Sequence, residues 1–214
     1  MVSFGIDIKS EVQWLQIFIA VGSLYCSLRL SIRTFISVDV SIKDIINELQ
    51  NKIAMEEEWR MDQVRAVEGQ NLHFTLVFLG EISSETAEIL KSQLANLEFQ
   101  PFSVTYKGLG AFPSSANPRI VWMGTDFEGG KKLMDLYQKV AVCIRDAGLI
   151  PDKPFIPHVT LFRIKYRGLK LFRMLAKYED LKFGSDFIDS FHLKKSQPTQ
   201  TGSIYSDMLT VYGK

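Results

Sequence analysis

Residues 71–80 read NLHFTLVFLG, an apolar stretch that carries a histidine and a threonine two positions apart. Because side chains alternate across a strand, His73 and Thr75 point to one face while Phe74 and Leu76 point to the other. An apolar strand gains no stability from a titratable imidazole beside a hydroxyl. The segment therefore predicts a strand with one face for the core and one face for function.

The same pattern returns in residues 157–163, PHVTLFR, where His158 and Thr160 stand in the same relation. The chain has three histidines, and two of them belong to a His-x-Thr-Leu tetrad. Nine threonines among 214 residues make two such coincidences rare. We therefore interpret the two tetrads as halves of one site.

Composition favours one large domain or two closely packed lobes, since 214 residues with 46% apolar side chains can build an ample core. Positive and negative charges nearly cancel, with 25 basic and 24 acidic residues. Such a chain has no strong field for duplex nucleic acid or an anionic membrane. A nucleic-acid partner would be a local end or a few nucleotides, and we expect a monomer that does not act on a membrane.

The two cysteines, Cys26 and Cys143, are far apart in sequence and form no CxxC or CxxH pattern. Isolated thiols argue against structural zinc and against a disulfide framework. No third ligand of a suitable type is spaced near either tetrad, so we expect no metal and no other cofactor. The cysteines indicate a reducing compartment, and we predict a cytoplasmic location.

Residues 1–30 differ in character from the rest of the chain. Residues 14–28, WLQIFIAVGSLYCSL, are apolar but fall short of the roughly 20 residues that a membrane-spanning helix needs. Asp7, Lys9 and Glu11 give a mixed charge where a secretory signal needs a basic one. Residues 1–30 are therefore predicted to be a docked element, a loose appendage or the product of an upstream start codon, and residues 31–214 to be the functional domain.

Periodic patterns after residue 30 predict strands and helices in alternation. Residues 31–40 alternate as a strand, and Ser41 is the expected N-cap of a helix whose apolar residues recur at helical spacing. Ser83 or Ser84 is expected to cap a second helix. The remaining expected elements are strands at 102–109 and 119–124, a helix at 129–147 stopped by Gly148, a short helix at 169–177, an irregular strand region at 183–193 and a closing strand at 204–211.

The order of these elements is a coarse internal repeat, because each motif strand is preceded by a helix and followed by a helix and further strands. This order predicts an α+β fold with two pseudo-symmetric lobes of antiparallel sheet and outer helices around a central cleft. A pseudo-twofold relation between the lobes would bring the two His-x-Thr faces together in that cleft.

Two histidines in one cleft can cleave a phosphodiester by acid–base catalysis without a metal. An unperturbed imidazole titrates near pH 6.5, so one ring can accept a proton while the other donates one. The transition state spreads negative charge over the non-bridging phosphate oxygens. A threonine hydroxyl two residues along the strand is placed to donate a hydrogen bond to them.

Five segments together resemble the 2H phosphoesterases, in particular the RNA 2′,3′-cyclic phosphodiesterases, which are also called 2′-5′ RNA ligases. These segments are RTFISVDV, NLHFTLVFLGE, NPRIVWMG, PHVTLFR and GSIYSDMLTVY, and the resemblance covers roughly residues 33–214. It implies two lobes around a basic cleft and hydrolysis of a 2′,3′-cyclic phosphate to a 2′-phosphomonoester. It also implies that His73 protonates the departing 3′ oxygen and that His158 activates water, with Thr75 and Thr160 on the phosphate.

Arg163 is a further candidate phosphate ligand, although it follows His158 by five positions. Period two places it on the opposite face of an ideal strand, so only a twist or a bulge would bring its guanidinium to a phosphate. His192 has no threonine partner, and we interpret it as structural. Other candidates for the groove are Arg119, Lys165, Arg167 and Lys170 as basic residues, which are more typical of a solvated face, and Phe112, Phe162 and Tyr205 as stacking residues.

Three functions fit these residues. The first is hydrolysis of RNA 2′,3′-cyclic phosphate ends, with the reverse 2′-5′ ligation as a further activity. The second keeps the chemistry but changes the substrate to a small cyclic nucleotide or a 2′-5′ oligoadenylate, since the tetrads handle phosphate and carry no information on the base. The third is a non-catalytic module that binds RNA ends, and two intact tetrads argue against it because a binding module needs no pair of proton carriers.

Overall fold

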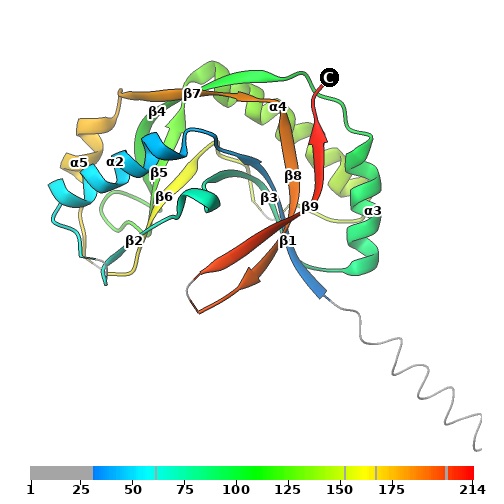
Figure 1. Ribbon diagram of the computed structural model, residues 1–214, viewed down its shortest axis with the longest axis horizontal. Helices are drawn as coiled ribbons and strands as arrows, with labels where there is room; N and C mark the ends of the chain where they lie inside the picture. The colour runs from blue at the N-terminus through cyan, green and yellow to red at the C-terminus, as the bar shows by residue number, and fades with distance from the viewer. Residues whose placement is uncertain (1–30, 61, 152, 167, 201) are drawn as a thin grey trace, which may run out of the picture. The chain divides into compact units, whose positions relative to one another are not determined.

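The computed structural model describes residues 31–60, 62–151, 153–166, 168–200 and 202–214 (Figure 1). These residues form nine strands, four α-helices and one short 3-10 helix. In chain order they are β1 (Ser31–Asp39), α2 (Lys43–Glu56), β2 (Val64–Ala66), η1 (Gly69–Asn71), β3 (His73–Ser83), α3 (Ser84–Ala95), β4 (Phe102–Phe112), β5 (Ile120–Thr125), α4 (Phe127–Asp146), β6 (Val159–Ile164), α5 (Phe172–Tyr178), β7 (Lys182–Ile188), β8 (Ser190–Pro198) and β9 (Ser203–Tyr212).

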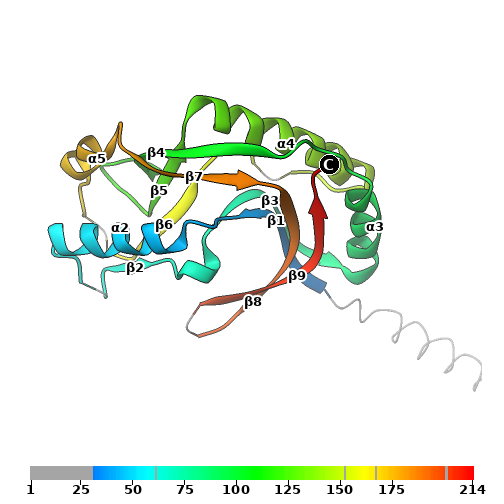
Figure 2. The same ribbon diagram turned by 45° about the horizontal axis from the view of Figure 1, so that its top comes forward.

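The strands form one curled sheet in the order β7-β4-β5-β6-β3-β1-β8-β9, with β2 paired to β6. Antiparallel pairing joins β7 to β4, β4 to β5, β5 to β6, β2 to β6, β6 to β3, β1 to β8 and β8 to β9. Figure 2 shows the bend that carries β8 and β9 away from the strands at the other end of the sheet. The predicted α+β class is confirmed. The two predicted halves meet at β3 and β6, so the two motif strands are neighbours.

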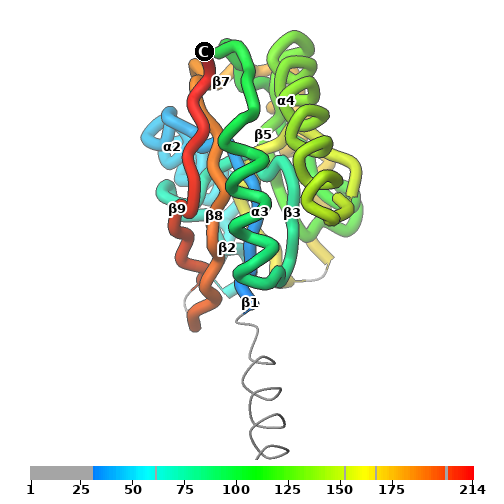
Figure 3. The backbone as a smooth tube through the Cα atoms, turned by 90° about the vertical axis from the view of Figure 1, so that its right-hand side faces the viewer, coloured from blue at the N-terminus to red at the C-terminus, as the bar shows by residue number. Residues whose placement is uncertain are grey.

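Each α-helix places an apolar stripe against the sheet or against another helix. In α2 the buried apolar residues are Ile46, Leu49 and Ile53, which recur at the spacing of one helical face. Helices α3 and α4 lie side by side on the outside of the sheet, near β3 (Figure 3). Helices α2 and α5 lie together at one end, where Glu56 accepts hydrogen bonds from Lys177 and Tyr178.

Element boundaries match the sequence prediction in part. Ser83 caps α3 as expected, since its hydroxyl accepts a hydrogen bond from the Thr86 N–H. Ser41 was the wrong cap for α2: its N–H and its hydroxyl both donate to the Asp186 carboxylate, and the helix begins at Lys43. The N-terminal turn of α4 begins at Phe127, two residues earlier than predicted.

Several smaller features were absent from the sequence prediction. Asp126 caps α4 by accepting a hydrogen bond from the Gly129 N–H. The irregular region at 183–193 is two strands, β7 and β8, that meet at Asp189. Strand β2 and helix η1 were not predicted, because three-residue elements leave no periodic pattern.

Residues 32–214 form one compact unit. The predictions for residues 1–30, Cys26 among them, lie outside the described residues. No helix among the residues that the structure describes is long and apolar enough to cross a membrane.

Candidate active site

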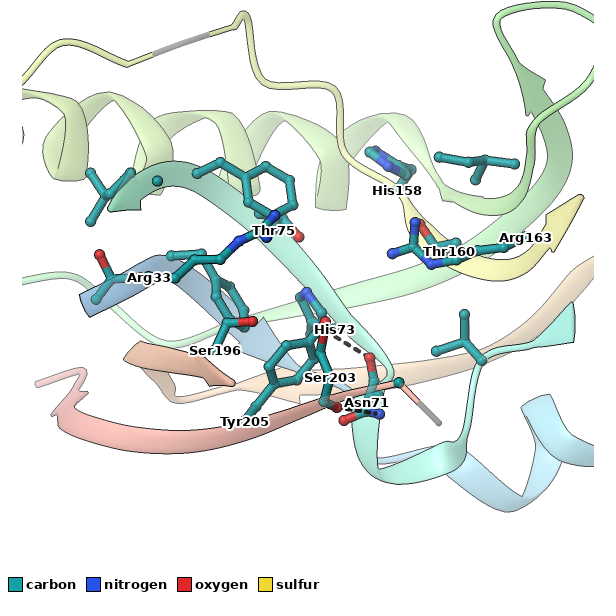
Figure 4. Close-up of a pocket in the computed structure, with 18 of the residues that line it drawn as sticks. Arg33, Asn71, His73, Thr75, His158, Thr160, Arg163, Ser196, Ser203 and Tyr205 are labelled. Carbon is teal, nitrogen blue, oxygen red and sulfur yellow. Dashed lines mark hydrogen bonds between the residues drawn. The ribbon is translucent and has the colours of Figure 1, made fainter. Parts of the chain in front are cut away.

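A cavity of about 860 Å³ opens over the centre of the sheet and is lined by both tetrads (Figure 4). His73 and Thr75 enter it from β3, Thr160 enters it from β6, and His158 enters it from the residue just before β6. The structure thus brings the four residues that the sequence singled out into one cavity.

The register between β3 and β6 explains how the two tetrads meet. Phe74 pairs with Val159 in an antiparallel ladder. Extended by one residue in each direction, this register places His73 opposite Thr160 and Thr75 opposite His158. Side chains opposite each other in an antiparallel pair lie on the same face of the sheet. Phe74 is fully buried on the other face, where its ring stacks on Tyr106.

Both imidazoles are oriented by the same backbone contact. The Nδ1 atom of His73 lies 2.8 Å from the carbonyl oxygen of Asn71, and that of His158 lies 2.7 Å from the carbonyl oxygen of Ile156. A carbonyl oxygen only accepts, so Nδ1 carries the proton in each ring. Nε2 is left as the exchangeable nitrogen of each histidine. Asn71 is itself fixed, because its side-chain amide donates to the Ser203 carbonyl of β9 (Figure 4).

Aromatic rings surround His73 on two sides. The ring centroid of Phe35 lies 5.1 Å away, and that of Tyr205 lies 5.5 Å away in an edge-on arrangement. Burial lowers the pKa of His73 from its usual 6.5 to about 4, because the charged imidazolium loses its water. The Asn71 carbonyl raises this pKa and Asp39 also raises it, whereas Lys194 and Arg163 lower it.

His158 has a similar aromatic setting. Phe112 lies edge-on at a centroid distance of 5.1 Å, and Trp122 lies at 6.2 Å. Trp122 covers Gly110 of β4, where an added Cβ would come within 2.1 Å of the indole. Burial lowers the pKa of His158 as well, against an upward effect of the Ile156 carbonyl. Burial therefore favours the neutral form of both histidines when no ligand is bound, which differs from the one-neutral, one-charged pair that unperturbed values suggest.

A β-bulge in β6 places Arg163 on the cavity wall. Along β5, Val121 pairs with Phe162 and Trp122 pairs with Thr160, so Leu161 is an extra residue on β6. The extra residue shifts the alternation, and Arg163 then shares a face with Thr160 instead of opposing it. Arg163 lines the cavity as the bulge hypothesis required, and its guanidinium makes no hydrogen bond or ion pair with another described residue.

The cavity lining also includes three basic residues that the sequence did not single out, and these are Arg33, Arg65 and Lys153. Arg65 stands opposite Arg163 in the β2–β6 ladder, and it pairs with Glu68 at 3.5 Å. Arg33 and Arg65 belong to no tetrad, so nothing in the local pattern predicted their positions. Only the pairing of β2 with β6 and of β1 with β3 brings them to the site.

Most of the other candidates lie elsewhere. Among the three stacking candidates, only Tyr205 is one of the described residues that line the cavity. Phe112 packs on His158 but does not line the cavity, and Phe162 is buried against Trp59. Arg167 lies outside the described residues. Arg119, Lys165 and Lys170 are not among the lining residues.

His192 belongs to a charged cluster between β1, β8 and β9. Its Nδ1 lies 3.0 Å from the Thr210 hydroxyl, and Lys194 beside it forms ion pairs with Asp39 and Asp207 at 2.9 and 2.7 Å. The cluster ties three strands together, which suits the structural interpretation of His192. Within the described residues, no group of three or more His, Cys, Asp or Glu side chains is placed to hold a metal ion.

Known proteins have this fold and a similar sequence. A crystal structure of a Thermus thermophilus protein superposes with a TM-score of 0.67 at 27% identity, covering 85% of this chain and 99% of that one. The LigT-like phosphoesterase family matches residues 36–122. An RNA 2′,3′-cyclic phosphodiesterase of Archaeoglobus fulgidus is 37% identical over 182 residues, which cover 82% of this chain and 97% of the relative. One of Aquifex aeolicus is 40% identical over 166 residues, with 75% and 87% covered.

The matching family model and the relatives make this curled sheet that of a phosphoesterase. The chain belongs to the LigT-like phosphoesterase family.

Proposed function

We propose that this protein hydrolyses RNA ends that carry a 2′,3′-cyclic phosphate and leaves a 2′-phosphomonoester. The observation that carries the proposal is the convergence of two His-x-Thr pairs on one cavity, each histidine with Nδ1 bound to a backbone carbonyl. Two exchangeable Nε2 atoms and two hydroxyls are the groups that a two-proton displacement at phosphorus requires. The names of the relatives support the same reaction.

In the proposed mechanism His158 is the base and His73 is the acid. Nε2 of His158 takes a proton from water while the water oxygen bonds to phosphorus. The bond from phosphorus to the 3′ oxygen breaks, and the 3′ oxygen receives a proton from Nε2 of His73. Thr75 and Thr160 donate hydrogen bonds to the non-bridging oxygens, where negative charge grows in the transition state. Arg163 pairs with the negative charge that the phosphate carries in the bound substrate and in the transition state alike.

His73 must hold a proton to act as the acid, yet its pKa is about 4 in the free protein. An anionic phosphate in the cavity supplies the missing negative charge, because a nearby opposite charge favours the imidazolium. We therefore propose that substrate binding charges His73. Product release then returns the site to its neutral state.

An RNA end suits the site better than a small cyclic nucleotide. The cavity of about 860 Å³ is near the upper end of the roughly 300–1,000 Å³ of small-molecule sites. Arg33, Arg65 and Lys153 also add positive charge beyond the four tetrad residues. A nucleotide with one further phosphodiester can use such groups, whereas a nucleoside cyclic phosphate has only one phosphate.

The same site supports the reverse 2′-5′ ligation. A 5′-hydroxyl replaces water, loses its proton to His158 and attacks the cyclic phosphate, and the 3′ oxygen leaves with a proton from His73. The product is a 2′-5′ phosphodiester. We propose this as a second activity of the same groups, performed by a single chain because one chain supplies both tetrads. The cytoplasmic location stays a prediction.

A hydrolysis assay with an oligoribonucleotide ending in 2′,3′-cyclic phosphate tests the proposal. In the presence of EDTA the wild-type protein should yield a 2′-phosphate end, since the mechanism routes no step through a metal. His73→Ala and His158→Ala should each lose about 10²–10⁴-fold in kcat, because each removes one proton carrier. His192→Ala is the matched control and should keep its activity.

Three outcomes would contradict the proposal. Full activity in either tetrad variant would remove the two-histidine mechanism. A 3′-phosphate product would contradict the assigned leaving group. Binding of the 2′-phosphate end without any turnover would leave a binding module instead of an enzyme.

A further inference from the structure

Gln50 is a buried polar residue on the otherwise apolar inner face of α2. Its side chain is 4% exposed, and its buried neighbours on the helix are Ile46, Leu49 and Ile53. Burying an amide without hydrogen-bond partners lowers the stability of the fold, so the partners of Gln50 indicate why it is buried. The Nε2 atom of Gln50 donates to two backbone carbonyls, that of Leu161 at 2.8 Å and that of Val67 at 3.0 Å.

Leu161 is the extra residue of the bulge in β6. Its carbonyl also accepts a hydrogen bond from the Val67 N–H at 2.8 Å. Gln50 therefore fastens the bulge to the chain just beyond β2, at the point where the β2–β6 ladder ends at Ala66 and Phe162. Leu161 and Val67 are linked twice, once by the backbone and once through the amide of Gln50.

The bulge is what carries Arg163 to the cavity. Arg163 follows Thr160 by three residues, an odd spacing that places the two side chains on opposite faces of a regular strand. Because no residue of β5 stands opposite Leu161, Leu161 and Phe162 are both buried, and Arg163 is exposed on the face of Thr160. Loss of the bulge would turn Arg163 away from the phosphate.

We propose that Gln50 is a positioning residue for Arg163, acting through the carbonyl of Leu161. Gln50 is not among the residues that line the cavity. Its amide stabilises the bulged conformation of β6, and the bulge presents the guanidinium to a substrate phosphate. The inference rests on the proposed function in one respect, because Arg163 is taken to bind that phosphate.

A double-mutant cycle between Gln50→Met and Arg163→Ala tests the proposal. Methionine has a similar length and packs among apolar neighbours but donates no hydrogen bond. Gln50→Met should raise KM for a 2′,3′-cyclic phosphate substrate about tenfold with little change in kcat, as expected when ground-state binding of a charged group is lost. In the Arg163→Ala background the same change should alter KM by less than about twofold.

Independent effects would overturn the proposal. If the double variant shows the product of the two single losses, Gln50 stabilises the fold without acting through Arg163. Ile53→Val is the matched control, since it loosens the same buried face of α2 and its side chain donates no hydrogen bond to the bulge; its KM should match the wild type. If Gln50→Met does not fold, Gln50→Asn enters the same cycle, because its shorter amide cannot reach both carbonyls.

Binding of adenosine 2′-phosphate, measured by calorimetry without turnover, separates this inference from the proposed function. Binding that depends on Arg163 and Gln50 in a non-additive way supports the positioning role even if no hydrolysis is found. Binding that Gln50→Met leaves unchanged, while Arg163→Ala weakens it, would contradict the positioning role even if hydrolysis is confirmed.

Discussion

His73 and His158 are held by the same device, a backbone carbonyl two residues upstream of each ring. The device fixes the tautomer in which Nε2 exchanges protons. It uses no acidic side chain, so no neighbouring carboxylate is needed to orient the rings. Desolvation is then the largest influence on the pKa of each histidine, and it lowers both pKa values.

The pH dependence of kcat/KM follows from these two lowered values. The pKa of His73 is about 4, and that of His158 lies below 6.5. The active form has His73 charged and His158 neutral, and its fraction is largest between the two macroscopic values. We predict a bell-shaped profile of kcat/KM with its maximum below pH 6.5 and a fall of about tenfold per pH unit above the upper value.

The profile of kcat should lie at higher pH than that of kcat/KM. Bound phosphate is negative and raises the pKa of both imidazoles in the complex. Steady-state rates across a pH series from acid to mildly alkaline conditions measure both profiles. The burial argument would be contradicted by a maximum of kcat/KM above neutral pH. It would also be contradicted by a kcat profile that lies at lower pH than the kcat/KM profile.

Arg33 is the residue that should distinguish substrates by length. It lines the cavity from the start of β1, and its guanidinium makes no hydrogen bond or ion pair with another described residue (Figure 4). Arg33→Ala should lower kcat/KM about tenfold for a dinucleotide that ends in 2′,3′-cyclic phosphate, because one charge-assisted contact to the second phosphate is lost. Adenosine 2′,3′-cyclic phosphate lacks that phosphate and should be affected by less than about twofold.

Lys170→Ala is the control for Arg33, since it removes one exposed positive charge outside the cavity lining. Equal losses on the two substrates in Arg33→Ala would mean that Arg33 acts on the scissile phosphate or on folding. An unchanged rate on both would remove it from the site.

Strands β4 and β5 support His158 through one close contact between Gly110 and Trp122. Gly110 pairs with Trp122 across these strands, and an added Cβ would overlap the indole. Gly110→Ala should therefore lower the free energy of unfolding by about 1–3 kcal/mol and lower kcat by displacing Trp122 from His158. Thermal unfolding and steady-state rates measure the two effects.

A smaller ring should relieve this overlap. The double variant Gly110→Ala with Trp122→Phe is expected to recover part of the lost stability, because phenylalanine leaves room for the added methyl group. A double variant that is less stable than either single variant would contradict the steric explanation.

Sequence periodicity located the two motif strands, because a histidine and a threonine in an apolar run are conspicuous. It did not determine the face of Arg163, since period two gives the opposite answer and the bulge depends on pairing with β5. Ser41 failed as a cap for a related reason. Its partner Asp186 lies 145 positions away and belongs to β7, so the competing contact is invisible to local pattern.

The described residues that line the cavity all lie within the compact unit 32–214. We propose that residues 31–214 form the phosphoesterase domain. A chain trimmed to residues 31–214 should keep kcat/KM within about twofold of the full chain, because residues 32–214 form one compact unit that has its own core and carries both tetrads. Loss of activity with retained folding would show that residues 1–30 contribute to the site.

The two halves of the sheet meet where β3 pairs with β6, and this junction is what the α+β prediction could not place. Sequence order alone allowed two lobes facing each other at any distance. The positions of Arg33 and Arg65 could not be predicted for the same reason, since both reach the cavity through strand pairings that leave no local sequence pattern.

The central claim is that both His-x-Thr pairs act on one phosphorus atom, and a crystal structure with bound adenosine 2′-phosphate tests it most directly. We predict a single phosphate whose oxygens lie about 2.6–3.2 Å from Nε2 of both histidines and from the hydroxyls of Thr75 and Thr160. A phosphate bound by one tetrad alone, or elsewhere in the cavity, would contradict the two-histidine mechanism.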